Sequence, residues 1–354
     1  MESLFHSIIY QVFKKHLIMK NLKFSALLLF LASIFALPSC TEDAMLTEDG
    51  LTNPGIENRS SSTIVEIALS DPDFSILVDA VVRANLVGAL SSRGPFTVFA
   101  PTNDAFDAFL SANGFNNINE VPVGLLTTVL TTHVLRGEAF AADINSGYFK
   151  TLATAPNRRP SDIYISADNG VTINGDVNVV AADVDASNGV IHVIDKVIAP
   201  SSIVTLAASN PNFSILVQAL TRPDLSVDFV AALSGNGPFT VLAPTNAAFV
   251  ALLDSNPAWS SLDDIPAATL EAVLTYHVAA GSFTSEYLFR RPTINTLLDG
   301  ATYTTSFSFG GGGSTFGGAP TLNIIAGSNQ AKVVASNVQA QNGVIHAIDA
   351  VILP

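Results

Sequence analysis

Apolar residues recur along the chain at helical and strand spacings, and the whole series occurs twice. Each series opens with apolar positions three and four residues apart. They are Phe74, Leu77, Val78, Val81 and Val82 in the first copy, and Phe213, Leu216, Val217 and Leu220 in the second. This spacing predicts an amphipathic helix with one buried face. Asp71-Pro72 and Asn210-Pro211 precede the runs and mark where each helix begins.

The stretch GPFTVFAPTNDAF, residues 94–106, returns as GPFTVLAPTNAAF at residues 237–249 with two substitutions. Its short apolar run, ended by proline, predicts a strand. Thr102 and Thr245, or the asparagines that follow them, then predict the N-cap of a helix. A catalytic threonine would need a base and an orienting group, whereas capping requires neither. We therefore interpret both threonines as structural.

A further helical pattern leads to a matched histidine in each copy. Leu126, Val129 and Leu130 precede His133, and their counterparts precede His277. Each histidine shares a face with the leucines. This placement favours a buried ring bonded to the backbone over a metal ligand.

Each copy ends in β-branched runs separated by Asn-Gly turn signals, which predict hairpins. The closing runs are NGVIHVIDKVIAP and NGVIHAIDAVILP, and they predict a strand that is apolar on both faces. His192 and His346 lie in these strands, where a polar ring needs a hydrogen-bond partner. Each copy offers two histidines and no cysteine, fewer ligands than a zinc site uses. We predict no cofactor.

Matched motifs are separated by 139 to 154 residues, so the chain is a tandem duplication. We predict domains over residues 60–200 and 201–354. The largest change in spacing coincides with FSFGGGGSTFGGAP, residues 307–320. This tract lacks the lysine of a phosphate-binding loop, and we predict a mobile hairpin tip.

The segment before the repeats has the features of an export signal. From Met19, two lysines precede an apolar run too short to favour a membrane span, followed by small residues. We predict a signal peptide over residues 1–39, with Met19 as the true start of the protein. LPSC resembles a lipobox, in which Cys40 becomes diacylated. The alternative is an ordinary signal with an incidental cysteine.

Residues 40–59 predict an acidic tether from lipid to folded domain. Glu42 and Asp43 resemble the surface-export signals of lipoproteins in Bacteroidetes-like bacteria. Acyl chains would anchor the protein without a spanning helix, since each buried methylene contributes about 0.8 kcal/mol.

Composition narrows the classes of partner. Hydrophobic residues make up 48% of the chain and charged residues 13%, which predicts a folded protein. The net charge of −14 disfavours nucleic acid and anionic lipid headgroups, whose binding depends on basic side chains. Cys40 is the only cysteine in the chain, so no intramolecular disulfide can form.

The paired motifs GPFTV…APTN and NGVIH resemble the two conserved stretches of fasciclin-like domains, once in each copy. The resemblance implies an α+β fold, a β-wedge or sandwich flanked by several helices. It also implies adhesion to proteins, matrix or glycans and a generally non-enzymatic role. The chain agrees with the last point, since it carries no catalytic motif of the hydrolase, phosphate-loop or zinc-protease types.

The resemblance also suggests a ligand contact. In animal members a Tyr-His pair is associated with integrin binding, and it falls here on Tyr276-His277. The first copy departs from the pair with Thr132-His133, and core packing is the alternative role. The unmatched loop ATAPNRRPSD, with Arg158 and Arg159, is a second candidate contact.

These observations predict a lipid-anchored, two-domain binding module at the outer membrane, exposed on the cell surface. Its partners would be surface or matrix proteins or glycans. The alternatives are a periplasmic accessory lipoprotein and a small-ligand carrier or enzyme on the same scaffold.

Overall fold

The first repeat folds into seven strands and a set of short helices. The computed structural model describes residues 60–290, 292–308 and 321–354. The helices are α2 (Ile64–Ser70), η1 (Pro72–Phe74), α3 (Ser75–Arg83), α4 (Val87–Leu90), α5 (Asn103–Ala112), η2 (Ile118–Glu120), α6 (Val123–Thr132) and η3 (Ala141–Asp143). The strands are β1 (Phe96–Pro101), β2 (Val134–Arg136), β3 (Gly147–Thr154), β4 (Pro160–Ser166), β5 (Thr172–Ile173), β6 (Val177–Ala186) and β7 (Gly189–Ile194).

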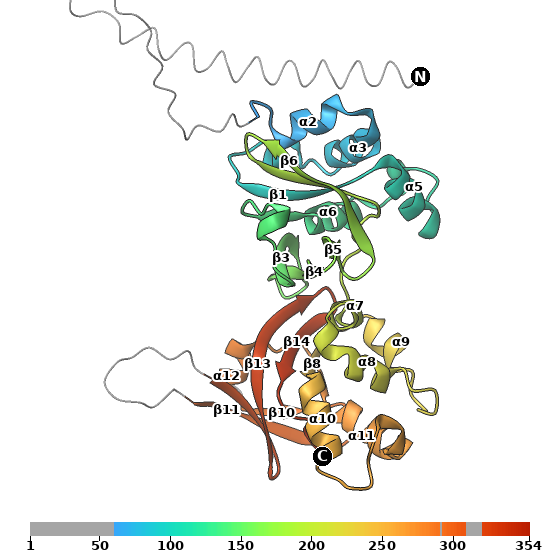
Figure 1. Cartoon of the computed structure of the whole chain (residues 1–354), viewed down its shortest axis with the longest axis vertical. Helices are drawn as coiled ribbons and strands as arrows, with labels where there is room; N and C mark the ends of the chain where they lie inside the picture. The colour runs from blue at the N-terminus through green and yellow to red at the C-terminus, as the bar shows by residue number, and fades with distance from the viewer. Residues whose placement is uncertain (1–59, 291, 309–320) are drawn as a thin grey trace, which may run out of the picture. The chain divides into compact units, whose positions relative to one another are not determined.

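The second repeat has the same order of elements, with α12 in the place of η3. Its helices are α7 (Ile203–Ala208), η4 (Pro211–Phe213), α8 (Ser214–Leu220), α9 (Phe229–Ser234), α10 (Asn246–Asp254), η5 (Leu262–Asp264), α11 (Ala267–Tyr276) and α12 (Ser285–Arg290). Its strands are β8 (Phe239–Pro244), β9 (Val278–Ala280), β10 (Thr293–Asn295), β11 (Thr302–Ser308), β12 (Thr321–Ala326), β13 (Asn329–Ala340) and β14 (Gly343–Ile348). Figure 1 follows this order by colour.

The sheet of each domain joins its first strand to its last. In the first domain β1 pairs in parallel with β7, from Phe96↔Gly189 onward, and the seven strands close into a barrel. In the second, β8 pairs in parallel with β14 from Phe239↔Gly343 and the strand order is β10-β11-β12-β13-β14-β8-β9. All other pairs are antiparallel. The predicted α+β class is confirmed.

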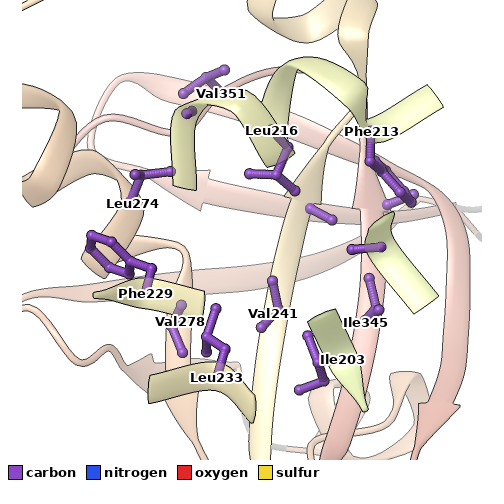
Figure 2. Packing of buried hydrophobic residues seen from close by; sticks show 14 of the residues in the cluster. Ile203, Phe213, Leu216, Phe229, Leu233, Val241, Leu274, Val278, Ile345 and Val351 are labelled. Carbon is purple, nitrogen blue, oxygen red and sulfur yellow. The ribbon is translucent and has the colours of Figure 1, made fainter. Parts of the chain in front are cut away.

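Apolar side chains lie on both faces of the central strands, as predicted for the closing runs. In the second domain, Val241 and Ile345 belong to a cluster covered by α7 to α11. Their neighbours Leu242 and Ile348 belong to a separate cluster on the other side, with α12. Figure 2 shows the first cluster, in which helical and strand side chains meet. Each fully buried side chain of this size contributes about 1.5–3 kcal/mol.

The first predicted helix of each copy differs in detail from its expected form. A 3-10 turn, η1 or η4, comes before the α-helix. The side chains of Asp71 and Asn210 accept hydrogen bonds from the amides two residues on, Asp73 and Asn212. This tight bonding favours a 3-10 turn at the start, and the α-helix begins only after the phenylalanine.

The signal peptide, Cys40, the tether and the glycine-rich tract after residue 308 lie outside the described residues. The strands on either side of that tract form a hairpin, since β11 and β12 pair as far as Ser308↔Thr321. Across the described ranges, no helix combines the length and apolar character needed to cross a membrane.

Candidate functional site

The repeated threonines cap helices, and the asparagines beside them join two helices. Thr102 Oγ1 accepts a hydrogen bond from the Ala105 amide at 3.3 Å. The next side chain, Asn103 Oδ1, accepts from the amide of Ile76 at 3.0 Å, at the start of α3. Thr245 and Asn246 repeat both contacts in the second copy. The motif therefore positions α5 against α3, and α10 against α8.

The histidines after α6 and α11 bond the backbone through both ring nitrogens. His133 Nδ1 lies 2.7 Å from the carbonyl oxygen of Val129, so it donates there, and Nε2 accepts from the amide of Ile198 at 2.9 Å. His277 makes the equivalent bonds, to Val273 and from Ile352. Burial lowers the pKa of both rings to about 4, which keeps them neutral near neutral pH.

The strand histidines lie beside a β-bulge. His192 Nε2 donates to the carbonyl of Ala139 at 2.9 Å, and its Nδ1 accepts from the amide of Asp183 at 3.3 Å. Asp183 has φ 60° where β6 shifts register against β7. His346 Nε2 donates to Phe283 O at 2.8 Å, and burial lowers its pKa to about 4. His192 therefore connects the bulged strand β6 to the segment after β2, whereas His346 bonds only the segment after β9.

A second repeated asparagine, Asn188 or Asn342, bonds the first residue of the first helix in its domain. The sequence patterns did not single out this residue. Asn188 Oδ1 accepts from the amide of Ile64, and its Nδ2 donates to the carbonyls of Leu90 and Ser92. Asn342 makes the matching contacts in the second copy. Its invariance between the copies was the available signal. The residue was interpreted only as part of an Asn-Gly turn, and this interpretation gave no reason to expect side-chain contacts with distant backbone groups.

Tyr276 and His277 are both 3% exposed. The Tyr276 hydroxyl donates to the carbonyl of Thr302 at 2.7 Å, and the ring packs in the cluster on the α12 side of the sheet. This placement favours core packing for the pair. A ligand contact at Tyr276 or His277 stays a prediction.

The loop with Arg158 and Arg159 is the tip of the β3–β4 hairpin, and it contacts the second domain. Arg159 forms an ion pair with Glu286 at 3.4 Å. Asn157 Nδ2 donates to Ser282 Oγ at 2.9 Å. Arg158 is exposed and has φ 63°. The ligand contact at these arginines stays a prediction, and Arg159 already has a partner within the chain.

The chemistry available at these positions is structural. Among residues 60–290, 292–308 and 321–354, no three His, Cys, Asp or Glu side chains are placed to hold a metal ion. His133 and His277 use their basic nitrogens to accept backbone amides. The capping hydroxyls of Thr102 and Thr245 likewise accept amides. At these positions the threonine and histidine side chains bond the backbone and so support the fold.

The two copies share an exposed apolar position at the bulged strand. Val180 on β6 is 60% exposed and its counterpart Val334 on β13 is 54% exposed. Val180 lines a surface groove of about 490 Å³ with small apolar residues from η3 and β6. Exposed valine at the same position of both domains is a candidate for contact with other molecules.

Comparison with known proteins identifies related sequences. A model of the fasciclin domain matches residues 72–200 and 211–354. Protein sll1483 of Synechocystis sp. is 46% identical over 141 residues, 40% of this chain and 75% of that protein. Transforming growth factor-beta-induced protein ig-h3 of Sus scrofa is 31% identical over 239 residues, 67% of this chain and 32% of that protein.

A solved structure of a FAS1 domain pair from the insect cell adhesion molecule fasciclin I is also similar. It is 17% identical with a TM-score of 0.43, and the match covers 82% of this chain and 96% of that one.

Proposed function

The chain belongs to the fasciclin family, and from this we propose that it is a non-enzymatic binding module, held at the cell surface by lipid on Cys40, that recognises protein, matrix or glycan ligands. The family is represented in adhesion-related extracellular proteins, where its domains are non-catalytic modules.

One observation carries the binding role. Four polar residues that repeat between the copies use their side-chain nitrogen or oxygen atoms to bond the backbone. They are Thr102, His133, Thr245 and His277. The duplicated polar chemistry therefore builds scaffold and leaves recognition to surface positions. The matched exposed valines, Val180 and Val334, are such positions. Two weak sites on one chain gain affinity through effective concentration.

The anchor is supported by sequence. Cys40 follows an apolar export signal at the position where a lipobox places its lipidated residue, and an acidic tether separates it from the first domain. The negative charge of the chain disfavours direct binding to anionic headgroups, so membrane attachment would depend on the acyl chains.

The experiment is protease shaving of intact cells that express the wild type or Cys40→Ala, with blotting for the second domain. We expect cleavage of the wild type from outside and release of the variant into soluble fractions. Protection of the wild type until the outer membrane is opened would overturn the surface location and favour a periplasmic accessory role. Retention of Cys40→Ala in membranes would overturn the lipid anchor.

A small-ligand carrier is the second candidate, and the groove beside Val180 is the observation that favours it. Its lining side chains are apolar, the backbone contributes polar surface, and its volume of about 490 Å³ is within the range of small-molecule sites. Incubating the purified chain with a cell extract and analysing co-purified small molecules by mass spectrometry tests this role. A stoichiometric compound lost in Val180→Glu would support it.

A further inference from the structure

Hydrogen bonds cross the boundary between the two repeats, and the most buried of them ends on a carboxylate. Asp162, on β4 of the first domain, is 3% exposed. Its Oδ2 accepts the backbone N–H of Gln339, on β13 of the second domain, at 2.6 Å. Lys150 Nζ lies 3.3 Å from the other oxygen. A buried carboxylate requires such partners, because desolvation of an unpaired charge is costly.

The tip of the β3–β4 hairpin extends this contact. Asn157 Nδ2 donates to the side-chain oxygen of Gln339 at 2.6 Å, as well as to Ser282. Gln339 is 1% exposed, so both its backbone amide and its side-chain oxygen are bound by the first domain away from solvent. The Arg159–Glu286 pair lies at the exposed rim.

A second set of contacts lies along α7. The Tyr148 hydroxyl donates to the carbonyl of Leu206 at 2.9 Å and accepts from Asn210 Nδ2 at 3.2 Å. The Tyr148 ring packs against the core cluster of the second domain. Asn174 Nδ2 donates to Ser201 Oγ at 3.0 Å. The boundary therefore includes apolar packing as well as polar contacts.

The two copies differ at positions that make these contacts. Gln339 corresponds to Asp185 in the first copy, and Asn210 corresponds to Asp71. Aspartate at 339 would place a carboxylate beside Asp162, and aspartate at 210 could not donate to Tyr148. At both positions the second copy has a neutral amide in place of an acid, which suits a surface that faces Asp162 and Tyr148.

We propose that Asp162, together with Gln339 and Asn210, fixes the two fasciclin domains as a single body, so that a ligand meets both domains in one set arrangement. Asp162 acts as a positioning residue. The opposing arrangement would be two independent modules joined by the segment between β7 and α7. This inference is independent of the ligand and of the cellular location.

The test measures the distance between nitroxide labels on the two domains by pulsed electron paramagnetic resonance. Labels at Asp107→Cys and Val250→Cys occupy matched, exposed positions on α5 and α10, in a chain carrying Cys40→Ser. We expect a narrow distance distribution without further substitution. Gln339→Asp, which restores the residue of the first copy, should at least double its width. Asp185→Gln, the reciprocal change away from the boundary, should leave it narrow.

Two variants at position 162 keep the test decisive if Gln339→Asp folds poorly. Asp162→Asn retains an acceptor for the Gln339 amide and should remain narrow, whereas Asp162→Ala removes the acceptor and should broaden the distribution. A broad distribution before these substitutions overturns the proposal. So does an unchanged width in both Gln339→Asp and Asp162→Ala.

Discussion

His133 and Ile198 are joined by a hydrogen bond in which the ring Nε2 accepts the backbone N–H of Ile198 at 2.9 Å. The bond connects the end of α6 to the segment after the last strand of the domain, 65 residues further on. His277 and Ile352 repeat it in the second domain at 3.1 Å. Protonation of either ring would remove the acceptor.

Stability should therefore decrease in mild acid. Burial lowers the pKa of His133 and His277 from 6.5 to about 4, so the unfolded chain binds protons at a higher pH than the folded one. The free energy of unfolding should fall between about pH 6.5 and 4, by up to about 1.4 kcal/mol per pH unit for each histidine. Urea titrations across this range measure it. The double variant His133→Gln/His277→Gln should have a shallower pH dependence, and an unchanged slope would contradict the assignment.

The repeated asparagines should be more important for stability than their location in turns suggests. Asn188→Ala and Asn342→Ala each leave a backbone amide and two carbonyls without their side-chain partner, and we expect a loss of roughly 2–4 kcal/mol. Chemical denaturation followed by circular dichroism measures the change. Asn119→Ala, at an exposed position on η2, serves as the control and should shift stability by less than about 0.5 kcal/mol.

Removing the N-cap hydroxyl of either repeated threonine should lower the free energy of unfolding by a modest amount. Thr102→Ala and Thr245→Ala should each cost about 1 kcal/mol, because each removes one acceptor from the first turn of a helix. The costs should add in the double variant, since the sites lie in different domains. Serine at either position should restore most of the loss. A failure of serine to rescue would argue that the threonine methyl group, rather than the hydroxyl, is the important feature.

The negative charge of Asp162 should not be needed for the stability of the fold, whereas its side-chain oxygen, which accepts the Gln339 amide, should be needed. Burial raises the pKa of this carboxyl above 3.8, so its contribution to stability is present below that pH and is lost as the pH rises through the folded-state value. At pH 7 we expect Asp162→Asn to be at least as stable as the wild type, and Asp162→Ala to lose about 1–3 kcal/mol. Thermal melting at pH 7 compares them. Equal losses in both variants would contradict this.

The matched valines provide a test of recognition. Val180→Glu and Val334→Glu should each reduce binding of the full chain to its immobilised protein or glycan ligand, and the double variant should reduce it at least tenfold through loss of both sites. Their melting temperatures should stay near that of the wild type because both side chains are exposed. Val250→Glu is the control: it is 48% exposed, but its counterpart in the first copy is Asp107. Equal loss in the control would assign the effect to charge alone.

Local sequence signals were sufficient for most elements. Several elements depend on residues within a few positions of one another. Examples are the strand that ends at Pro101, the helix that begins after Thr102 and the turn at Asn174-Gly175. The histidine predictions rest on the same reasoning, because a ring on an apolar face must find a backbone partner. The identity of that partner, Ile198 for His133, depends on the fold and could not be obtained locally.

The hydrophobic and polar patterns of the sequence did not predict the contacts between the two repeats. Arg158 and Arg159 were predicted as ligand contacts because their loop has no counterpart in the second copy. The structure places the tip of this loop against Gln339 and Ser282, and the ligand contact at the two arginines stays a prediction. An unmatched loop can serve an external partner or the neighbouring repeat, and sequence spacing does not distinguish the two. The substitution of Asp185 by Gln339 between the copies was the available signal.

The parallel pairing of the first and last strands also sets a condition on how the protein is made. Gly189 follows its partner Phe96 by 93 residues, and Gly343 follows Phe239 by 104. A nascent chain cannot complete either sheet until nearly the whole domain has emerged. Such distant pairing slows folding and leaves strand edges exposed in the meantime. Chaperones that hold the unfolded chain would therefore have to protect each domain until its final strand arrives.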